Sequence, residues 1–392
     1  MGREKAKASV AVVGIGSMGR GIVSVLKSMK DVKVVAIADI DRKALEQASP
    51  YVTNDCLITT NPMRIFQQSP DILVEATTAI TEAALLVRHA LRNQVHVVLT
   101  NSELDQAFGR LLAHEADVNH VILTSDAGDQ HGVLVRMIDD IRLMGFKVVM
   151  AGNVKGFLDR YATPESIAVE AEKRRLSLKQ CTAYTDGTKL AIEMALVANA
   201  AELNILQTGM IGPATKHVDK ALEMFDLQRA RDLGGVVDFV LGAEPGGSVF
   251  VIGYSEDTED RFYMNYYKMG RGPYYLFLRP YHICHYETPL TIQRIMKYRE
   301  PILVQKRRVL EVGCRAKTDL LAGTELEGIG GHHFNGFLEQ PHSLPVGLAE
   351  GATLIKPKNR NEAIDWDDVE FPENDPRLEL WEAQRVIDDR RQ

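Results

Sequence analysis

The chain has 392 residues, of which 45% are hydrophobic and 25% are charged. This composition is typical of an ordinary soluble globular protein, and the length favours two or three domains over one. The formal net charge is −7, and no basic stripe interleaves with aromatic residues. We therefore expect no nucleic-acid partner.

Cysteine use points to a reducing compartment. The four cysteines are far apart and include no CxxC pair, which argues against a disulfide framework or a structural zinc site: Cys56, Cys181, Cys284 and Cys314. No apolar run approaches the roughly 18 residues of a membrane span, and the N-terminal apolar run continues directly into a glycine turn. We expect a cytoplasmic protein without a membrane partner.

The first third alternates short apolar runs with amphipathic segments, from about residue 8 to residue 127. This alternation predicts a doubly wound parallel sheet covered by helices. Strands are expected at 9–15, 32–39, 71–77, 95–100 and 120–126, and helices at 82–93 and 103–118.

The stretch "VAVVGIGSMGRGIVSVL" carries a GxGxxG motif where a predicted strand meets a predicted helix. Gly14 permits the tight turn, Gly16 lets the backbone approach a pyrophosphate, and Gly19 lets the helix pack close to the strand. Ser17 and Met18 begin the helix, whose free N–H groups and positive dipole end attract phosphates. The motif predicts a nicotinamide dinucleotide; the alternative is a glycine turn needed only for packing.

Asp39 ends the second predicted strand, at the spacing where an acid meets the adenosine ribose. A carboxylate there favours NAD, because it accepts hydrogen bonds from the 2′-OH and repels a 2′-phosphate. Arg42 and Lys43 follow at once and offer cations for that phosphate, or they form an exposed first helical turn. The choice between NAD and NADP stays open.

Polar residues follow the later strands, where ligands of parallel sheets bind. Thr77 and Asn101 are the cofactor candidates at these ends, and both are also good helix-capping types. The other strand-end candidates are Glu75, Ala76, Thr100, Ser125, Asp126 and Gly128.

The segment "CTAYTDGTKLAIEMALVANAAELN", residues 181–204, predicts a turn leading into a long helix. Asp186 or Thr188 is expected to cap it. Lys189 falls in the first turn, where a cation opposes the helix dipole. Such a lysine is held for a ligand or by a carboxylate, and Glu193 lies one turn later on the same face.

Two further segments offer polar groups for a substrate. Asn153 and Lys155 follow the predicted strand "FKVVMAG" and suit an anionic group, or form an exposed loop. In "GRGPYYLFLRPYHICHYETP", residues 270–289, the aromatics and prolines favour extended chain. Arg279 and His282 are the expected pocket contacts there; buried, hydrogen-bonded histidines are the alternative.

The loop "SDAGDQHG" at 125–132 contains Asp126, Asp129 and His131. Carboxylate oxygens suit a divalent ion such as Mg²⁺ or Mn²⁺. A loop of turn-forming residues is an equally good account, so the metal stays unknown.

Three stretches carry a family resemblance: "VEATT", "VVLTNSELD" and above all "YTDGTKLAIEMALVANA". Together they resemble homoserine dehydrogenases, specifically the group with a C-terminal SAF-like domain that includes proteins similar to 1-deoxy-D-xylulose 5-phosphate reductoisomerase. The resemblance implies that Lys189 transfers the proton at the substrate oxygen and that Asp186 positions it. The family spacing is DxxxK, whereas this chain has DxxK.

The last part resembles the SAF domain, a small β-clip module. The resemblance rests on "RVLEVGCRAKTDLLAGTELEGIGG" and on "AIDWDDV". We expect an α/β protein with three parts: a Rossmann domain at 1–128, an α+β catalytic and dimerisation domain at 129–302, and an SAF-like domain at 303–392.

The function predicted is an NAD(P)H-dependent oxidoreductase that acts on the carbonyl or hydroxyl of a small anionic substrate. It would be homoserine dehydrogenase-like or reductoisomerase-like, and a homodimer or higher homo-oligomer. The alternative is a non-catalytic regulatory protein that senses NAD(P).

Overall fold

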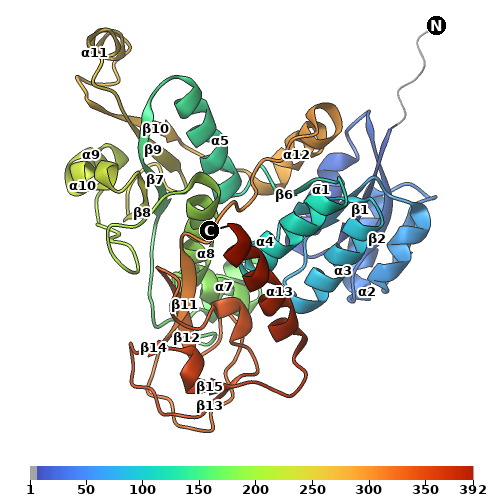
Figure 1. Ribbon diagram of the computed structural model, residues 1–392. Coiled ribbons are helices and arrows are strands. Elements are labelled where there is room, and N and C mark those ends of the chain that lie inside the picture. The colour runs from blue at the N-terminus through green and yellow to red at the C-terminus, as the bar shows by residue number, and fades with distance from the viewer. Residues whose placement is uncertain (1–6, 392) are drawn as a thin grey trace, which may run out of the picture. The chain divides into compact units, whose positions relative to one another are not determined.

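The computed structural model describes residues 7–391, which form two compact units (Figure 1). Both units are discontinuous in sequence. Unit 1 contains residues 7–132, 283–304 and 376–391, and unit 2 contains residues 133–282 and 305–375. The three continuous domains expected from the sequence stay a prediction.

Unit 1 is built on a six-stranded parallel sheet with the strand order β3-β2-β1-β4-β5-β6. This is the order of dinucleotide-binding folds, which confirms the predicted doubly wound sheet. The strands are β1 (Ala8–Val13), β2 (Val32–Ala38), β3 (Leu57–Thr59), β4 (Ile72–Glu75), β5 (His96–Leu99) and β6 (Leu123–Ser125). The sequence predicted all of these except β3, whose three residues are too few to show a pattern.

Amphipathic helices cover this sheet, as the periodicity predicted. They are α1 (Ser17–Leu26), α2 (Arg42–Ala48), α3 (Thr81–Arg92) and α4 (Ser102–Val118), with 3-10 helices η1 (Ser49–Tyr51) and η2 (Pro62–Gln68). The side chain of Asp41 caps α2, and that of Asn101 caps α4.

Two helices from late in the chain complete unit 1. In α12 (Cys284–Tyr298), Ile292 and Ile295 enter the apolar core. Figure 1 shows α13 (Pro376–Arg391) beside α4, where Asp388 pairs with the buried Arg110 at 2.9 Å. The sequence suggested extended chain up to Pro289, but α12 begins at Cys284 and includes this proline. As the sixth residue of α12, Pro289 removes one backbone hydrogen bond and crowds the His285 carbonyl, so packing must stabilise this helix.

Unit 2 contains a four-stranded mixed sheet in the order β10-β9-β7-β8. β7 (Lys147–Lys155) runs parallel to β8 (Val236–Leu241) and antiparallel to β9 (Val249–Tyr254), which pairs with β10 (Tyr274–Arg279). The helices are α6 (Ala168–Arg174), α7 (Leu178–Thr185), α8 (Thr188–Ala201), η3 (Val218–Lys220), α9 (Ala221–Met224), α10 (Leu227–Asp232) and α11 (Thr258–Tyr266); α5 (Gln130–Leu143) crosses the boundary between the units. Every residue of α8 is buried, as in a central core helix.

Residues 305–375 form a β-rich part of unit 2 with short strands and many turns, as the sequence indicated. Its sheets have the orders β12-β11-β14 and β13-β15. The elements are β11 (Glu311–Ala316), β12 (Phe334–Glu339), η4 (Val346–Leu348), β13 (Thr353–Leu354), β14 (Ala363–Ile364), η5 (Trp366–Asp368) and β15 (Val369–Glu370). Helix α8 packs against β11 and β12, where Thr188 Oγ1 accepts the Gly336 N–H at 2.8 Å.

Within residues 7–391, none of the helices has the length and apolar character needed to cross a membrane. All four cysteines lie in this range and none forms a disulfide.

Candidate functional site

Two of the three motif glycines are required by packing. Gly14 has φ +87°, and a Cβ there would lie 2.5 Å from the backbone of Ala76. A Cβ on Gly19 would lie 1.8 Å from the Gly14 carbonyl oxygen, so the first turn of α1 can approach the end of β1 only without a side chain. These contacts agree with the roles predicted for both residues.

Gly16 differs from its neighbours. Its φ is −63°, which any residue adopts, and a Cβ there would meet no heavy atom of the described structure within 4 Å. Gly16 is also the N-cap of α1, and no side chain caps this helix within the described residues. Packing therefore does not explain this glycine, whereas close approach of a pyrophosphate to the free N–H groups does. The loop fits a dinucleotide, with exposed Ser17 and half-buried Met18 at the helix start.

Asp39 lies at the end of β2 and touches the glycine turn. Its Oδ2 accepts the Ile15 N–H at 2.5 Å, and its Oδ1 accepts the Asp41 N–H at 2.8 Å. A carboxylate has about four lone-pair sites, so two remain for ribose hydroxyls. Arg42 and Lys43 are exposed in the first turn of α2.

Thr77 and Asn101 are connected through the loop after β4. Thr77 Oγ1 accepts the Ala79 N–H at 3.3 Å, and Asn101 Nδ2 donates to the Ala79 carbonyl oxygen at 2.7 Å. Asn101 Oδ1 accepts the Leu104 N–H at 3.0 Å, which is the capping role that the sequence allowed. The two residues lie together at the carboxyl ends of β4 and β5.

In unit 2, strand register aligns two of the substrate candidates. Asn153 on β7 pairs with Val249 on β9, and Val249 pairs with Arg279 on β10. Directly paired residues share one face of a sheet, so Asn153 and Arg279 face the same way, and Lys155, two residues on, shares that face. His282 Nδ1 lies 2.8 Å from the Gly247 carbonyl oxygen. All four candidates thus gather at one end of this sheet.

Helix α8 contributes the charged partner of this group. Glu193 Oε2 lies 3.6 Å from Lys155 Nζ, and the Glu193 side chain is 1% exposed. Glu193 lies within ion-pair distance of Lys155. The partnership of Glu193 with Lys189 that the sequence suggested stays a prediction. Lys189 is buried in the first turn of α8 and, four residues before Glu193, lies on the same helix face.

Asn153 is the most unusual residue of this group. It is fully buried, yet neither its Oδ1 nor its Nδ2 has a hydrogen-bond partner within the described structure. A buried amide without partners costs folding free energy, which keeps Asn153 a candidate for contact with a ligand.

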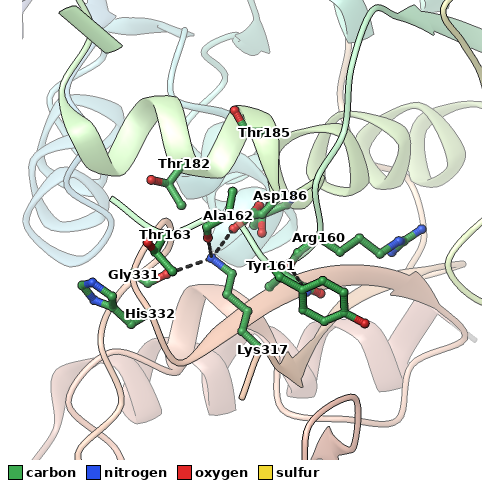
Figure 2. A network of polar contacts seen from close by, with 12 residues as sticks. Arg160, Tyr161, Ala162, Thr163, Thr182, Thr185, Asp186, Lys317, Gly331 and His332 are labelled. Carbon is green, nitrogen blue, oxygen red and sulfur yellow. Dashed lines mark hydrogen bonds and ion pairs between the residues drawn. The ribbon is translucent and has the colours of Figure 1, made fainter. Parts of the chain in front are cut away.

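Asp186 lies in a separate polar network, shown in Figure 2. Its Oδ2 lies 2.8 Å from Lys317 Nζ, and its Oδ1 accepts the Thr188 N–H at 2.8 Å. Lys317 also donates to the carbonyl oxygens of Ala162 and Gly331, both at 2.8 Å. Burial raises the pKa of Asp186, and the Lys317 ammonium opposes that shift. Asp186 thereby joins the start of α8 to the chain after β11, and Gly187, not Asp186 or Thr188, is the N-cap.

Lys317 was not singled out from the sequence. It lies far from Asp186 along the chain, and a lysine after a predicted strand is ordinarily exposed. No local pattern marks a pair that forms only in the folded chain.

The acidic loop in unit 1 fits a divalent ion poorly. Thr288 and Thr291 donate to the two carboxylate oxygens of Asp126, and burial raises the pKa of this residue to about 6. Asp129 Oδ2 lies 3.9 Å from His131 Nδ1. Asp126 and His131 are 3% and 2% exposed, so of the three expected ligands only Asp129 is open to an ion.

Comparison with known families supplies the class of activity. Residues 14–124 match the model of the homoserine dehydrogenase NAD-binding domain, and residues 128–288 match that of the catalytic domain of oxidoreductase DRL. The protein is an NAD(P)-dependent oxidoreductase. The first match contains the glycine turn, Asp39, Thr77 and Asn101, and the second contains all the catalytic and substrate candidates. A search of curated proteins found no match.

Some solved structures are similar to this chain at low identity and low TM-score. A homoserine dehydrogenase from Thiobacillus denitrificans is 15% identical, with TM-score 0.49, covering 81% of this chain and 83% of that one. A dihydrodipicolinate reductase from Paenisporosarcina sp. TG-14 is 17% identical, with TM-score 0.39, covering 75% of this chain and 97% of that one. For the WlbA dehydrogenase from Bordetella pertussis the identity is 16% and the TM-score 0.33; the match covers 41% of this chain and half of the WlbA chain. No substrate or partner follows from such similarities.

Proposed function

We propose that this oxidoreductase interconverts a carbonyl and a hydroxyl group on a small anionic substrate held in unit 2. The observation that carries the proposal is the fully buried side-chain amide of Asn153. Among residues 7–391 neither its donor nor its acceptor has a hydrogen-bond partner, and it lies on the same sheet face as Lys155 and Arg279. An amide can donate to one substrate oxygen and accept from a hydroxyl, and the two cations suit a carboxylate or phosphate.

Lys189 is the proposed acid and base. When bound, the nicotinamide supplies or accepts the hydride at the substrate carbon. In reduction, the Lys189 ammonium gives a proton to the carbonyl oxygen as the C=O π bond breaks, leaving a hydroxyl and a neutral amine; oxidation reverses these steps. Burial and the Lys155–Glu193 pair on the same side of α8 support this role.

Asp186 is proposed to act through the position of α8. Its carboxylate accepts the Thr188 N–H directly before Lys189, while Lys317 holds its other oxygen. This arrangement supports the positioning role that the resemblance implied and does not require Asp186 to touch the substrate.

Two substrate versions remain as proposals. One is the oxidation of homoserine, and the other is the reductive isomerisation of a phosphorylated deoxypentulose with Mg²⁺ or Mn²⁺. The engaged carboxylate of Asp126 gives the metal-dependent version less support from the 125–132 loop.

We also propose a cellular location, a type of C-terminal module and an oligomeric state for this protein. The four widely spaced cysteines, with no CxxC pair, support a cytoplasmic location. The short strands and turns of residues 305–375 support an SAF-like module. The exposed aromatics of the α11 region support a homo-oligomer, since such patches commonly mark interfaces: Phe262, Tyr263, Tyr266 and Tyr267. The mass in solution tests this last proposal.

The test of function is NADH or NADPH oxidation with aspartate semialdehyde or 1-deoxy-D-xylulose 5-phosphate, with and without Mn²⁺. Turnover of the semialdehyde supports the homoserine dehydrogenase version, and metal-dependent turnover of the pentulose phosphate supports the reductoisomerase version. Tight dinucleotide binding without turnover of either substrate would contradict both and favour the sensing alternative.

A further inference from the structure

Glu75, the last residue of β4, is a buried acid that the proposed chemistry does not use. Its side chain is 0% exposed. Its Oε1 accepts the Thr77 N–H at 2.8 Å, and its Oε2 has no hydrogen-bond partner within the described structure. Burial raises the pKa of Glu75 to about 7, although hydrogen bonding from Thr77 and Asn101 lowers it. The residue is thus poised to exchange a proton near neutral pH.

The register of the sheet places Glu75 centrally at the cofactor edge. Glu75 pairs with Val13 at the end of β1 and with Leu99 at the end of β5. Val13 directly precedes the glycine turn, and the backbone of Ala76 and Thr77 lies 2.5 Å from an ideal Cβ on Gly14. The residues after Glu75 therefore pack directly on the turn that receives the pyrophosphate.

A chain of hydrogen bonds extends from Glu75 to the start of α4. Glu75 holds the Thr77 N–H, Thr77 Oγ1 accepts the Ala79 N–H, and the Ala79 carbonyl oxygen accepts from Asn101 Nδ2. A change at Glu75 reaches both Thr77 and Asn101 through this chain.

We propose that Glu75 is a positioning residue of the cofactor site and takes up a proton when the dinucleotide binds. The inference rests on the proposed dinucleotide-dependent function and on the predicted contact of Thr77 and Asn101 with the cofactor. The pyrophosphate would bring negative charge to the carboxyl ends of the strands. Negative charge near a buried carboxylate disfavours its ionised form and favours the neutral acid.

The charged groups around Glu75 act in the same direction or are already engaged. Glu103, in the first turn of α4, raises the pKa of Glu75 further. Asp39, at the end of β2, is engaged with the backbone of Ile15 and Asp41. Glu82, in the first turn of α3, is exposed.

The experiment measures the dissociation constants of NADH and NADPH by fluorescence between about pH 6 and about pH 8. For a group with a free-state pKa near 7, proton uptake predicts that the wild-type affinity weakens about five- to tenfold across this range. Glu75→Gln, which resembles the neutral acid, should bind with a nearly constant affinity. Glu82→Gln removes an exposed charge in the first turn of α3 and should keep the wild-type profile.

Calorimetry in two buffers of different ionisation enthalpy gives a second readout on the wild-type protein alone. Net proton uptake on binding at about pH 7 supports the proposal even if Glu75→Gln does not fold. Wild-type affinity that is constant with pH, or an unchanged pH profile in Glu75→Gln, overturns it. Failure of the wild-type protein to bind either dinucleotide would instead overturn the cofactor assignment itself, and the inference with it.

Discussion

Lys317 and Asp186 form a buried ion pair, with Nζ 2.8 Å from Oδ2 and both side chains at most 2% exposed. The Lys317 ammonium also donates to the backbone carbonyl oxygens of Ala162 and Gly331. The pair fixes the junction of α7 and α8 to the chain that follows β11.

Lys317→Met should destabilise the protein by about 3–5 kcal/mol, because it leaves the Asp186 carboxylate buried without its cation. Urea unfolding measures this loss. Lys179→Met is the matched control: Lys179 is 62% exposed, so its removal should change the free energy of unfolding by no more than about 0.5 kcal/mol. Equal free energies of unfolding for the two variants would show that the Lys317–Asp186 pair does not stabilise the fold.

Substitutions of two motif glycines should affect different properties: Gly19→Ala the stability of the fold, and Gly16→Ala the affinity for the dinucleotide. Gly19→Ala forces a methyl group against the Gly14 carbonyl and should destabilise the protein by about 1–3 kcal/mol. Gly16→Ala should fold normally, since its Cβ enters open space, yet weaken dinucleotide affinity about ten- to a hundredfold through lost phosphate hydrogen bonds. Thermal melting and a binding titration check both. Unchanged affinity in Gly16→Ala would mean that the turn serves packing alone.

Asn153→Leu should make the folded protein more stable and the enzyme less active. Both amide atoms are buried and have no hydrogen-bond partner in the described part of the chain, so an apolar side chain of similar size should stabilise the fold by about 1–3 kcal/mol. The same change removes the proposed substrate contact and should lower kcat/KM about ten- to a hundredfold. Denaturant unfolding and steady-state kinetics test the two halves. A less stable variant with full activity would show that the amide is structural.

Stability should depend on pH through His332. Hydrogen bonds to Glu165 and Glu327 raise the pKa of its imidazole. The protonated imidazole therefore contributes to the free energy of unfolding. This contribution is fully present below the pKa of histidine in the unfolded chain, about 6.5, and is lost as the pH rises through the higher pKa in the folded protein. The effect is small because the side chain is 42% exposed.

The check on His332 is the difference in melting temperature between wild type and His332→Gln as a function of pH. The wild-type advantage should shrink from acidic to mildly alkaline pH. An advantage that grows with pH would reverse the sign and contradict the assignment.

Local patterns predicted much of the fold because they recur at short range. The glycine turn, the apolar strands of unit 1 and the buried helix α8 all follow from spacing within a few residues. The Lys155–Glu193 pair and the Lys317 network join segments that are distant in the sequence, so residue spacing within a short stretch cannot predict them. Helix α12 was missed because its aromatic residues and Pro289 favour extended chain, whereas packing of Ile292 and Ile295 in the core stabilises a helix.

The central claim is that Lys189 moves the proton in a reaction whose cofactor binds in unit 1. The most direct measurement compares Lys189→Met with wild type for turnover of whichever substrate is active and for dinucleotide affinity, with the exposed Lys220→Met as control. We predict that kcat falls about a hundred- to ten-thousandfold while the affinity for the dinucleotide stays within about twofold. Full turnover in Lys189→Met would contradict the account.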